Sequence, residues 1–207
     1  TGIGGRGVSE VVSRIVDTYR PEALMCLGYA GAASVELGPG DLVLYSSVCL
    51  LEAPVPVGES VVVEDSRRSD TDLLEQARRA LEGTATPFHE GDAVTVPHLV
   101  GEPEAKRQIG ERYAVKAIDM ESYWVAEAAS GRGLPFLGVR AITDTMAQRA
   151  PDLTSSIDGP GDLSYRRLLA HLLGHPLDIY PLFRLSRHSR RATRNLARFV
   201  SSYLSLG

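Results

Sequence analysis

Apolar residues spaced three and four positions apart predict the helices of this chain. From Val8 to Tyr19 they fall at positions 8, 11, 12, 15, 16 and 19, and the run stops at Arg20-Pro21. Similar spacing predicts helices over 71–81, 102–112, 121–130, 164–174 and 178–204. Thr71 is the expected N-cap of the helix over 71–81.

Short, continuous apolar runs predict strands that are buried on both faces. The runs 23–27 and 136–142 are of this type, and further strands are expected at 41–45, 61–63, 91–96 and 114–118. Small residues at 28–33 predict a turn, and residues 146–163 predict a loop. Strands that alternate with helices indicate an α/β domain with a mostly parallel sheet.

The chain opens on glycines, at Gly2, Gly4, Gly5 and Gly7, with no strand before them. A glycine turn normally connects two elements, so we expect a further N-terminal element to precede Thr1. The run also matches the dinucleotide-binding pattern G-x-G-x-x-G, but that motif requires a preceding strand, which argues against an oxidoreductase. We expect this turn to open the following helix, where its amides can bind an anion.

Charge is distributed unevenly along the 207 residues. The net charge is −4, and the six arginines of 181–207, a segment without acids, leave −10 for residues 1–180. An acidic body argues against a nucleic-acid partner. Apolar residues of the last helix form one stripe, which predicts docking on the body with a solvated basic face. An alternative is peripheral contact of that face with an anionic membrane. The stripe comprises Leu185, Ser189, Ala192, Leu196, Phe199 and Tyr203.

Cysteine and histidine spacing excludes the common metal sites. Cys26 and Cys49 form no C-x-x-C pair, and the five histidines show no H-E-x-x-H spacing, so we expect no metal. No apolar run approaches a membrane span and no signal peptide is visible. A cytoplasmic protein with free thiols is expected, with membrane association as the alternative.

Polar residues follow three of the expected strands, where open α/β sheets bind ligands. They are Gly28-Tyr29-Ala30-Gly31, Asp119-Met120-Glu121 and Thr143-Asp144. One carboxylate could hold a polyol, and another could act as a general acid where burial raises its pKa. Each carboxylate has a structural alternative: Asp119 and Asp144 could cap helices, and Glu121 could favour a helix start.

Six motifs follow one another along the chain: Thr1-Gly2-Ile3-Gly4, Gly28-Tyr29-Ala30-Gly31-Ala32, Gly40-Asp41-Leu42-Val43, Gly91-Asp92-Ala93, Asp119-Met120-Glu121-Ser122 and Pro135-Phe136-Leu137-Gly138-Val139-Arg140-Ala141-Ile142-Thr143-Asp144. Together these motifs resemble the nucleoside phosphorylase and nucleosidase superfamily, which includes purine and uridine phosphorylases and methylthioadenosine/S-adenosylhomocysteine nucleosidases. The motifs occur in the family's order over about 1–145, and the tail from Pro176 resembles its hopanoid-associated branch. The resemblance implies a three-layer α/β/α fold with a central mixed, mostly parallel sheet flanked by helices. Residues 1–175 would form this domain, without its first strands, and 176–207 a basic helix packed on it.

The resemblance also implies cleavage of a purine N-glycosidic bond. Asp144 would protonate the purine at N7, Glu121 would accept the ribose hydroxyls, and Met120 would pack on the sugar. Val94 and Thr95 would flank the base, with backbone groups reading its edge. The remaining predicted substrate contacts are Tyr29, Ala30 and Gly31, and the predicted phosphate or water pocket is Gly4, Gly28 and Tyr29.

Two departures concern the nucleophile. Tyr29 replaces the serine common in the family's turn, and Cys26 stands where bacterial purine phosphorylases carry an arginine. Both favour water over phosphate, although inorganic phosphate stays open as a co-substrate; no other cofactor is expected. A homo-oligomer and a lipid-linked substrate such as adenosylhopane are implied, and a non-catalytic nucleoside-binding module is the alternative function.

Overall fold

The computed structural model describes residues 7–51, 65–149 and 179–206. The expected strand 61–63, the helix 164–174 and the boundary at residue 175 lie outside these ranges. Within them the helices are α1 (Val8–Tyr19), α2 (Thr71–Leu81), α3 (Pro103–Tyr113), α4 (Ser122–Ser130) and α6 (Ile179–Leu204). The strands are β1 (Leu24–Ala32), β2 (Leu42–Leu50), β3 (Ser66–Arg68), β4 (Phe88–Thr95), β5 (Ala117–Asp119) and β6 (Phe136–Asp144).

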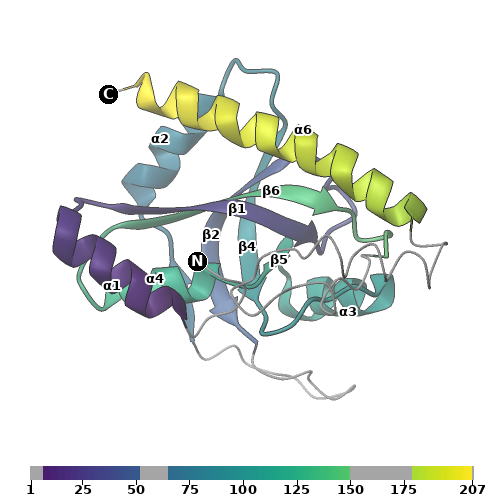
Figure 1. Cartoon of the computed structure of the whole chain (residues 1–207), viewed down its shortest axis with the longest axis horizontal. Coiled ribbons are helices and arrows are strands. Elements are labelled where there is room, and N and C mark those ends of the chain that lie inside the picture. Colours follow the sequence, from purple (N-terminus) through teal and green to yellow (C-terminus); the bar gives the residue numbers. More distant parts are fainter. Residues whose placement is uncertain (1–6, 52–64, 150–178, 207) are drawn as a thin grey trace.

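The strands form one mixed sheet in the order β3-β2-β4-β5-β1-β6. β1 runs parallel to β6, and β4 runs parallel to both β2 and β5. β2 also pairs antiparallel with β6, so the sheet curls until these two strands meet. Helices flank it on both faces, with α1 and α4 on one side and α2 and α6 on the other (Figure 1). The expected α/β class with a central, flanked sheet is confirmed.

Alternating residues of β2 build both faces of the core. Val43 and Tyr45 pack in the cluster that contains α4, whereas Leu42 and Leu44 pack in the cluster that contains α2 and α6. All four are fully buried. This alternation follows from the period of two in a strand, and it fixes which side of the sheet each helix covers.

The small residues after position 27 do not form the expected turn. β1 continues to Ala32 and pairs with β6 from Leu24 opposite Phe136 to Gly31 opposite Asp144. The strand uses small residues because polar side chains of β6 fill the space beside them. The turn prediction over this segment is therefore wrong.

Two helix boundaries are set by residues other than those expected. Asp70, not Thr71, caps α2, because its carboxylate accepts the backbone N–H groups of Asp72 and Leu73, both at 3.0 Å. Ala114 has a φ of 52°, and this left-handed residue ends α3 where a strand was expected to begin. β5 is correspondingly short.

α6 lies along one edge of the molecule and contributes to the core (Figure 1). Ala192 and Phe199 are fully buried against the sheet and α2. Asn195 donates to the carbonyl oxygen of Gly40 at 2.7 Å. No helix in the described part of the chain has the length and apolar character needed to cross a membrane.

Candidate active site

The three strand ends that the sequence singles out lie side by side in the sheet. Gly31 of β1 pairs with Ile118, which precedes Asp119, on one side and with Asp144 of β6 on the other. A Cβ added at Gly31 would lie 3.2 Å from a carboxylate oxygen of Asp144. The structure therefore brings the turn at 119–121 and Asp144 to the two sides of Gly31.

Asp119 holds this turn together from inside the protein. Its fully buried carboxylate accepts hydrogen bonds from Thr95 Oγ1 at 2.6 Å and Tyr45 Oη at 3.1 Å. The backbone N–H groups of Glu121 and Ser122 also donate to it, at 3.2 and 3.1 Å. Burial and the charge of Asp119 raise the pKa of Tyr45 well above its ordinary value, so its hydroxyl remains a donor. Asp119 is a capping residue for α4, as its position in the sequence indicates.

A buried cation, Arg140 of β6, connects Asp119 with Glu121. Arg140 Nε lies 3.0 Å from the Asp119 carboxylate, and Nη2 lies 3.5 Å from that of Glu121. The side chain of Arg140 is 5% exposed and that of Glu121 is 26% exposed. Burial raises the pKa of Glu121, and the charge of Arg140 offsets this only in part. Glu121 is thus a half-buried acceptor whose carboxylate is oriented by Arg140.

β1 leaves room for the Arg140 guanidinium. Gly28 is the register partner of Arg140, and a Cβ added at Gly28 would overlap Nη1. Cys26, two residues earlier on the same face, has its sulfur 3.3 Å from Nη2. Burial raises the pKa of the Cys26 thiol, although the charge of Arg140 opposes this, so the thiol stays neutral at pH 7. The predicted phosphate or water pocket at Gly28 therefore lies beside a guanidinium group.

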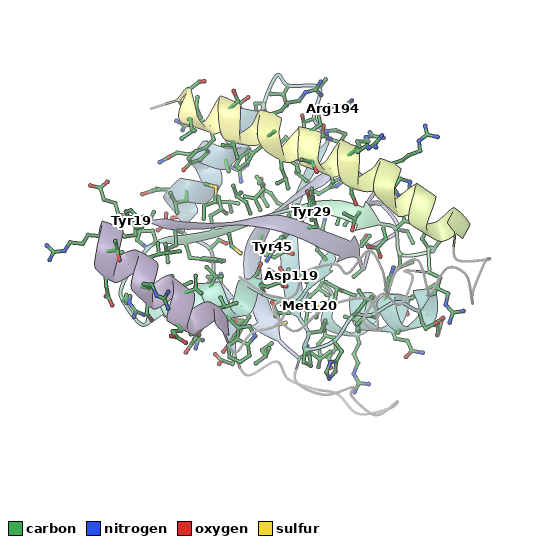
Figure 2. All side chains as sticks on the ribbon, viewed as in Figure 1. Tyr19, Tyr29, Tyr45, Asp119, Met120 and Arg194 are labelled. Carbon is green, nitrogen blue, oxygen red and sulfur yellow. The ribbon has the colours of Figure 1, made fainter. Side chains whose placement is uncertain are left out.

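Tyr29 points to the other side of β1. Successive strand residues face opposite ways, so Tyr29 points away from Arg140. Its hydroxyl lies 2.6 Å from Thr193 Oγ1 of α6 (Figure 2). The structure does not bring this side chain to the Arg140 side of the strand, and its predicted ligand contacts stay predictions. Ala30 is buried, and Gly4 of the predicted pocket lies outside the described residues.

The predicted base-flanking residues lie next to the turn at 119–121. Met120 packs against the apolar cluster that contains Val94. Thr95 is fully buried. Its hydroxyl donates a hydrogen bond to Asp119 and accepts one from the backbone N–H of Tyr123 at 2.9 Å. Its carbonyl oxygen accepts a hydrogen bond from a backbone N–H. Thr95 therefore supports the turn, and its predicted contact with a base stays a prediction.

Sequence reasoning missed the partner of Asp144, which is Lys106 of α3. Lys106 Nζ donates to Asp144 Oδ2, and Thr143 Oγ1 lies 3.0 Å from Oδ1. The side chain of Lys106 is 1% exposed, and that of Asp144 is 16% exposed. A signal existed, because Lys106, Ile109 and Gly110 have the spacing of one helical face and the structure turns that face inward.

The model of the phosphorylase superfamily matches residues 1–161. The chain belongs to the phosphorylase superfamily. Its predicted membership, and with it the class of nucleosidase and phosphorylase enzymes, is confirmed at the level of the family.

Curated relatives within the superfamily are named 5'-methylthioadenosine/S-adenosylhomocysteine nucleosidase. The protein of Chromohalobacter salexigens is 27% identical over 161 residues, which cover 74% of this chain and 68% of the relative. That of Staphylococcus saprophyticus is 25% identical over 150 residues, covering 70% and 66%. The chain thus spans about two thirds of the length of these relatives.

Solved structures of a nucleosidase and of a hydrolase have a similar fold. The 5'-methylthioadenosine/S-adenosylhomocysteine nucleosidase of Neisseria meningitidis, in complex with methylthio-immucillin-A, has a TM-score of 0.70 at 20% identity, covering 98% of this chain and 78% of that one. The futalosine hydrolase of Helicobacter pylori has a TM-score of 0.72 at 15% identity, covering 99% and 77%. The predicted hopanoid-associated branch stays a prediction.

Proposed function

We propose that this protein hydrolyses the N-glycosidic bond of a purine nucleoside. The observation that carries the proposal is that the turn that bears Glu121 and Asp144 lie on the two sides of Gly31, with Arg140 3.5 Å from the Glu121 carboxylate. The site thus offers an oriented acceptor for hydroxyl groups and a separate carboxyl group for proton transfer. The names of the curated relatives support this substrate class.

The two carboxyl groups have different tasks in the proposed reaction. Glu121, oriented by Arg140, accepts hydrogen bonds from the ribose hydroxyls and so fixes the sugar. A proton passes from Asp144 to N7 while the C1'–N9 bond breaks, and the bonding electrons leave with the neutral base. The oxygen of a water molecule bonds to C1', and its proton is released to solvent. Met120 packs on the sugar.

Water is the proposed nucleophile for three reasons. The curated relatives are nucleosidases, and Cys26 supplies no positive charge for a phosphate. The guanidinium of Arg140 is already directed at two carboxylates, which reduces its attraction for a third anion. Phosphorolysis would require an anion site beyond these groups.

Base release from the full-length protein tests the proposal. Adenosine, methylthioadenosine and an adenosylhopane are incubated with and without phosphate, and free adenine is measured by chromatography. We expect release without phosphate, and a loss of about 100-fold or more in Asp144→Asn, as for a missing general acid. Release that depends on phosphate would replace hydrolysis by phosphorolysis.

A non-catalytic nucleoside-binding module is the rival function. It predicts that nucleosides raise the melting temperature of the protein without any base release. Release from the wild type that Asp144→Asn removes would exclude this rival. Stabilisation alone, over all three nucleosides, would overturn the proposed activity.

A further inference from the structure

Lys106 places a buried positive charge directly on the proposed general acid. All of its recorded hydrogen bonds converge on one short segment: Nζ donates to the Asp144 carboxylate, to the carbonyl oxygen of Gln148 at 2.8 Å and to that of Thr145 at 3.3 Å. An ammonium group has three donors, so each finds an acceptor. With 1% exposure, the side chain is shielded from water.

The packing of α3 fixes Lys106 in this position. Gly110, one turn further along the same face, lies so close to the end of β1 that a Cβ there would overlap the carbonyl oxygen of Ala33. Because the helix has no room to move towards the strand, the Lys106 stem has a defined starting point. Lys106 is held against Asp144 by the fold as well as by its own hydrogen bonds.

This contact places a proton donor directly on the carboxylate of the proposed general acid. A neighbouring positive charge favours the ionised form of a carboxyl group. A general acid, however, must carry a proton when the substrate arrives. Lys106 Nζ, which donates to Asp144 Oδ2, is the nearest source of such a proton.

We propose that Lys106 is a positioning residue that supplies Asp144 with its proton, so that the acid of the site is the Lys106–Asp144 pair. The inference rests on the proposed function. An Nζ–H bond breaks and its proton passes to the Asp144 carboxylate, and the carboxyl group formed in this way then gives that proton to N7 as the C1'–N9 bond breaks. The Asp144 side chain, which is 16% exposed, then takes up a proton from solvent and passes it to the Lys106 amine, balancing the one released by the attacking water.

Two substitutions at Lys106 separate proton supply from charge and packing. Lys106→Met leaves Asp144 to hold the proton alone, so the alkaline limb of the pH profile of kcat should move to lower pH by at least about one unit. Lys106→Arg keeps the charge and donors, but a guanidinium does not release its proton at accessible pH. We expect both variants to lose at least about 10-fold in kcat. Lys116→Met, at a half-buried lysine paired with Glu36, is the matched control and should match the wild type.

The outcomes separate this inference from the proposed function. If the wild type is active and Lys106→Met has the same pH profile of kcat, the role of Lys106 is overturned but the proposed function is not. Wild-type kcat in Lys106→Arg overturns proton supply, because charge alone would then suffice. An inactive wild type overturns the proposed function and this inference with it. Lys106→Arg also provides the readout if Lys106→Met fails to fold.

An independent observation concerns the outer side of α6. We name as the α6 basic face its five exposed arginines, Arg187, Arg190, Arg191, Arg194 and Arg198. None of the ion pairs among the described residues involves them, whereas seven other arginines of the described ranges are paired. Like charges three and four residues apart repel each other on a helix. The α6 basic face therefore holds a charge that nothing in the described structure neutralises.

We propose that the α6 basic face binds an anionic lipid surface. α6 runs along one edge of the molecule, and Arg194 lies on its outer side (Figures 1 and 2). Leu204 and Leu206, at the end of the helix, are 73% and 55% exposed. A bilayer interface accepts both features, basic side chains at the headgroups and leucines at the acyl boundary, whereas a nucleic acid offers nothing to the leucines.

Vesicle co-sedimentation with the full-length protein tests this surface. We expect binding to vesicles that contain phosphatidylglycerol and not to pure phosphatidylcholine, with a loss of at least about 10-fold in a variant with Arg→Gln at 187, 190, 194 and 198. Arg→Gln at 14, 79 and 107, which are ion-paired, is the matched control. Equal binding by the two variants, no binding by the wild type, or tighter binding to an oligonucleotide than to the vesicles would overturn the proposal.

Discussion

Gly28 of β1 lies directly opposite Arg140 of β6, and the Arg140 guanidinium fills the space that a side chain at position 28 would need. The same guanidinium contacts the carboxylates of Asp119 and Glu121. The absent side chain thus lets one cation sit between strand and turn. Gly28 contributes to this site by leaving room for the Arg140 guanidinium.

Gly28→Ala should displace Arg140 and leave Glu121 without its orienting partner. We expect the KM for a nucleoside to rise by at least about 10-fold and the melting temperature to fall, because a buried pair is disturbed. Steady-state base release and thermal unfolding measure both effects. Gly131→Ala, where the new Cβ would have ordinary contacts from 3.5 Å, is the control. Wild-type kinetics in Gly28→Ala would show that Arg140 does not orient Glu121.

Asp119→Asn tests the support beneath the turn at 119–121. The substitution removes the buried negative charge 3.0 Å from Arg140, so that the more distant Glu121 is the carboxylate that still contacts this cation. Breaking a buried pair in this way should lower the free energy of unfolding by about 3 kcal/mol or more. Urea denaturation measures it.

The control for this prediction is Asp92→Asn at an exposed carboxylate. Asp92 accepts a hydrogen bond from Ser47 Oγ at 2.7 Å, and its loss should cost about 1 kcal/mol or less. Equal losses in the two variants would mean that the Asp119–Arg140 pair contributes no more than a surface contact.

Local patterns in the sequence predict the helices and the strand ends. The helices over 8–19 and 71–81 have the expected bounds, because three- and four-residue spacing is a local property. The run 28–33 misleads for the same reason, since glycine and alanine suggest a turn until Arg140 and Asp144 of a distant strand are known to occupy the space. The antiparallel contact of β2 with β6 likewise depends on the curl of the whole sheet.

In the candidate site, too, some residues are visible in the local sequence and others are revealed only by contacts between distant segments. Glu121 and Asp144 can be picked out because a carboxylate after a buried strand is visible in the sequence. Arg140 lies within a buried strand and Lys106 within a helix, and only their distances to those carboxylates reveal what they do. An arginine inside an otherwise apolar strand, and a lysine on an inward helical face, are the signals that could have identified them.

Phe199→Ala tests whether α6 is part of the folding unit. Phe199 is fully buried in the core cluster that includes Leu42 and Leu44. Removing a buried phenylalanine ring typically costs about 3–5 kcal/mol, so the free energy of unfolding should fall by this amount in denaturant titration. Leu204→Ala, at a side chain that is 73% exposed, is the control and should change it by less than about 0.5 kcal/mol. A small effect in both variants would show that the body folds without α6.

The pH dependence of stability in Glu121→Gln should report the burial of this carboxyl group. Burial raises the pKa of Glu121 in the folded protein, and unfolding returns it to its ordinary value. Between these two values the folded state binds more protons than the unfolded state, so the contribution of Glu121 to the free energy of unfolding falls as pH rises. Glutamine has no proton to lose. The free energy of unfolding of the variant, minus that of the wild type, should therefore increase from about pH 4 towards neutrality and then level off.

Glu104→Gln provides a comparison of opposite sign. Hydrogen bonds from Arg107 and Gln108 lower the pKa of Glu104 to about 2, so its ionised form stabilises the fold above the ordinary carboxyl range. For this exposed residue, the free energy of unfolding of the variant minus that of the wild type should become more negative as pH rises from about 2 to 5. This change should be smaller in high salt. Urea unfolding at several pH values measures both variants. Glu121→Gln is also expected to weaken ribose binding. A variant that is more stable and less active than the wild type would indicate that Glu121 is kept buried for ribose binding although its burial lowers stability. If the free energy of unfolding of the variant, minus that of the wild type, became more negative with rising pH in both variants, the burial of Glu121 would be contradicted.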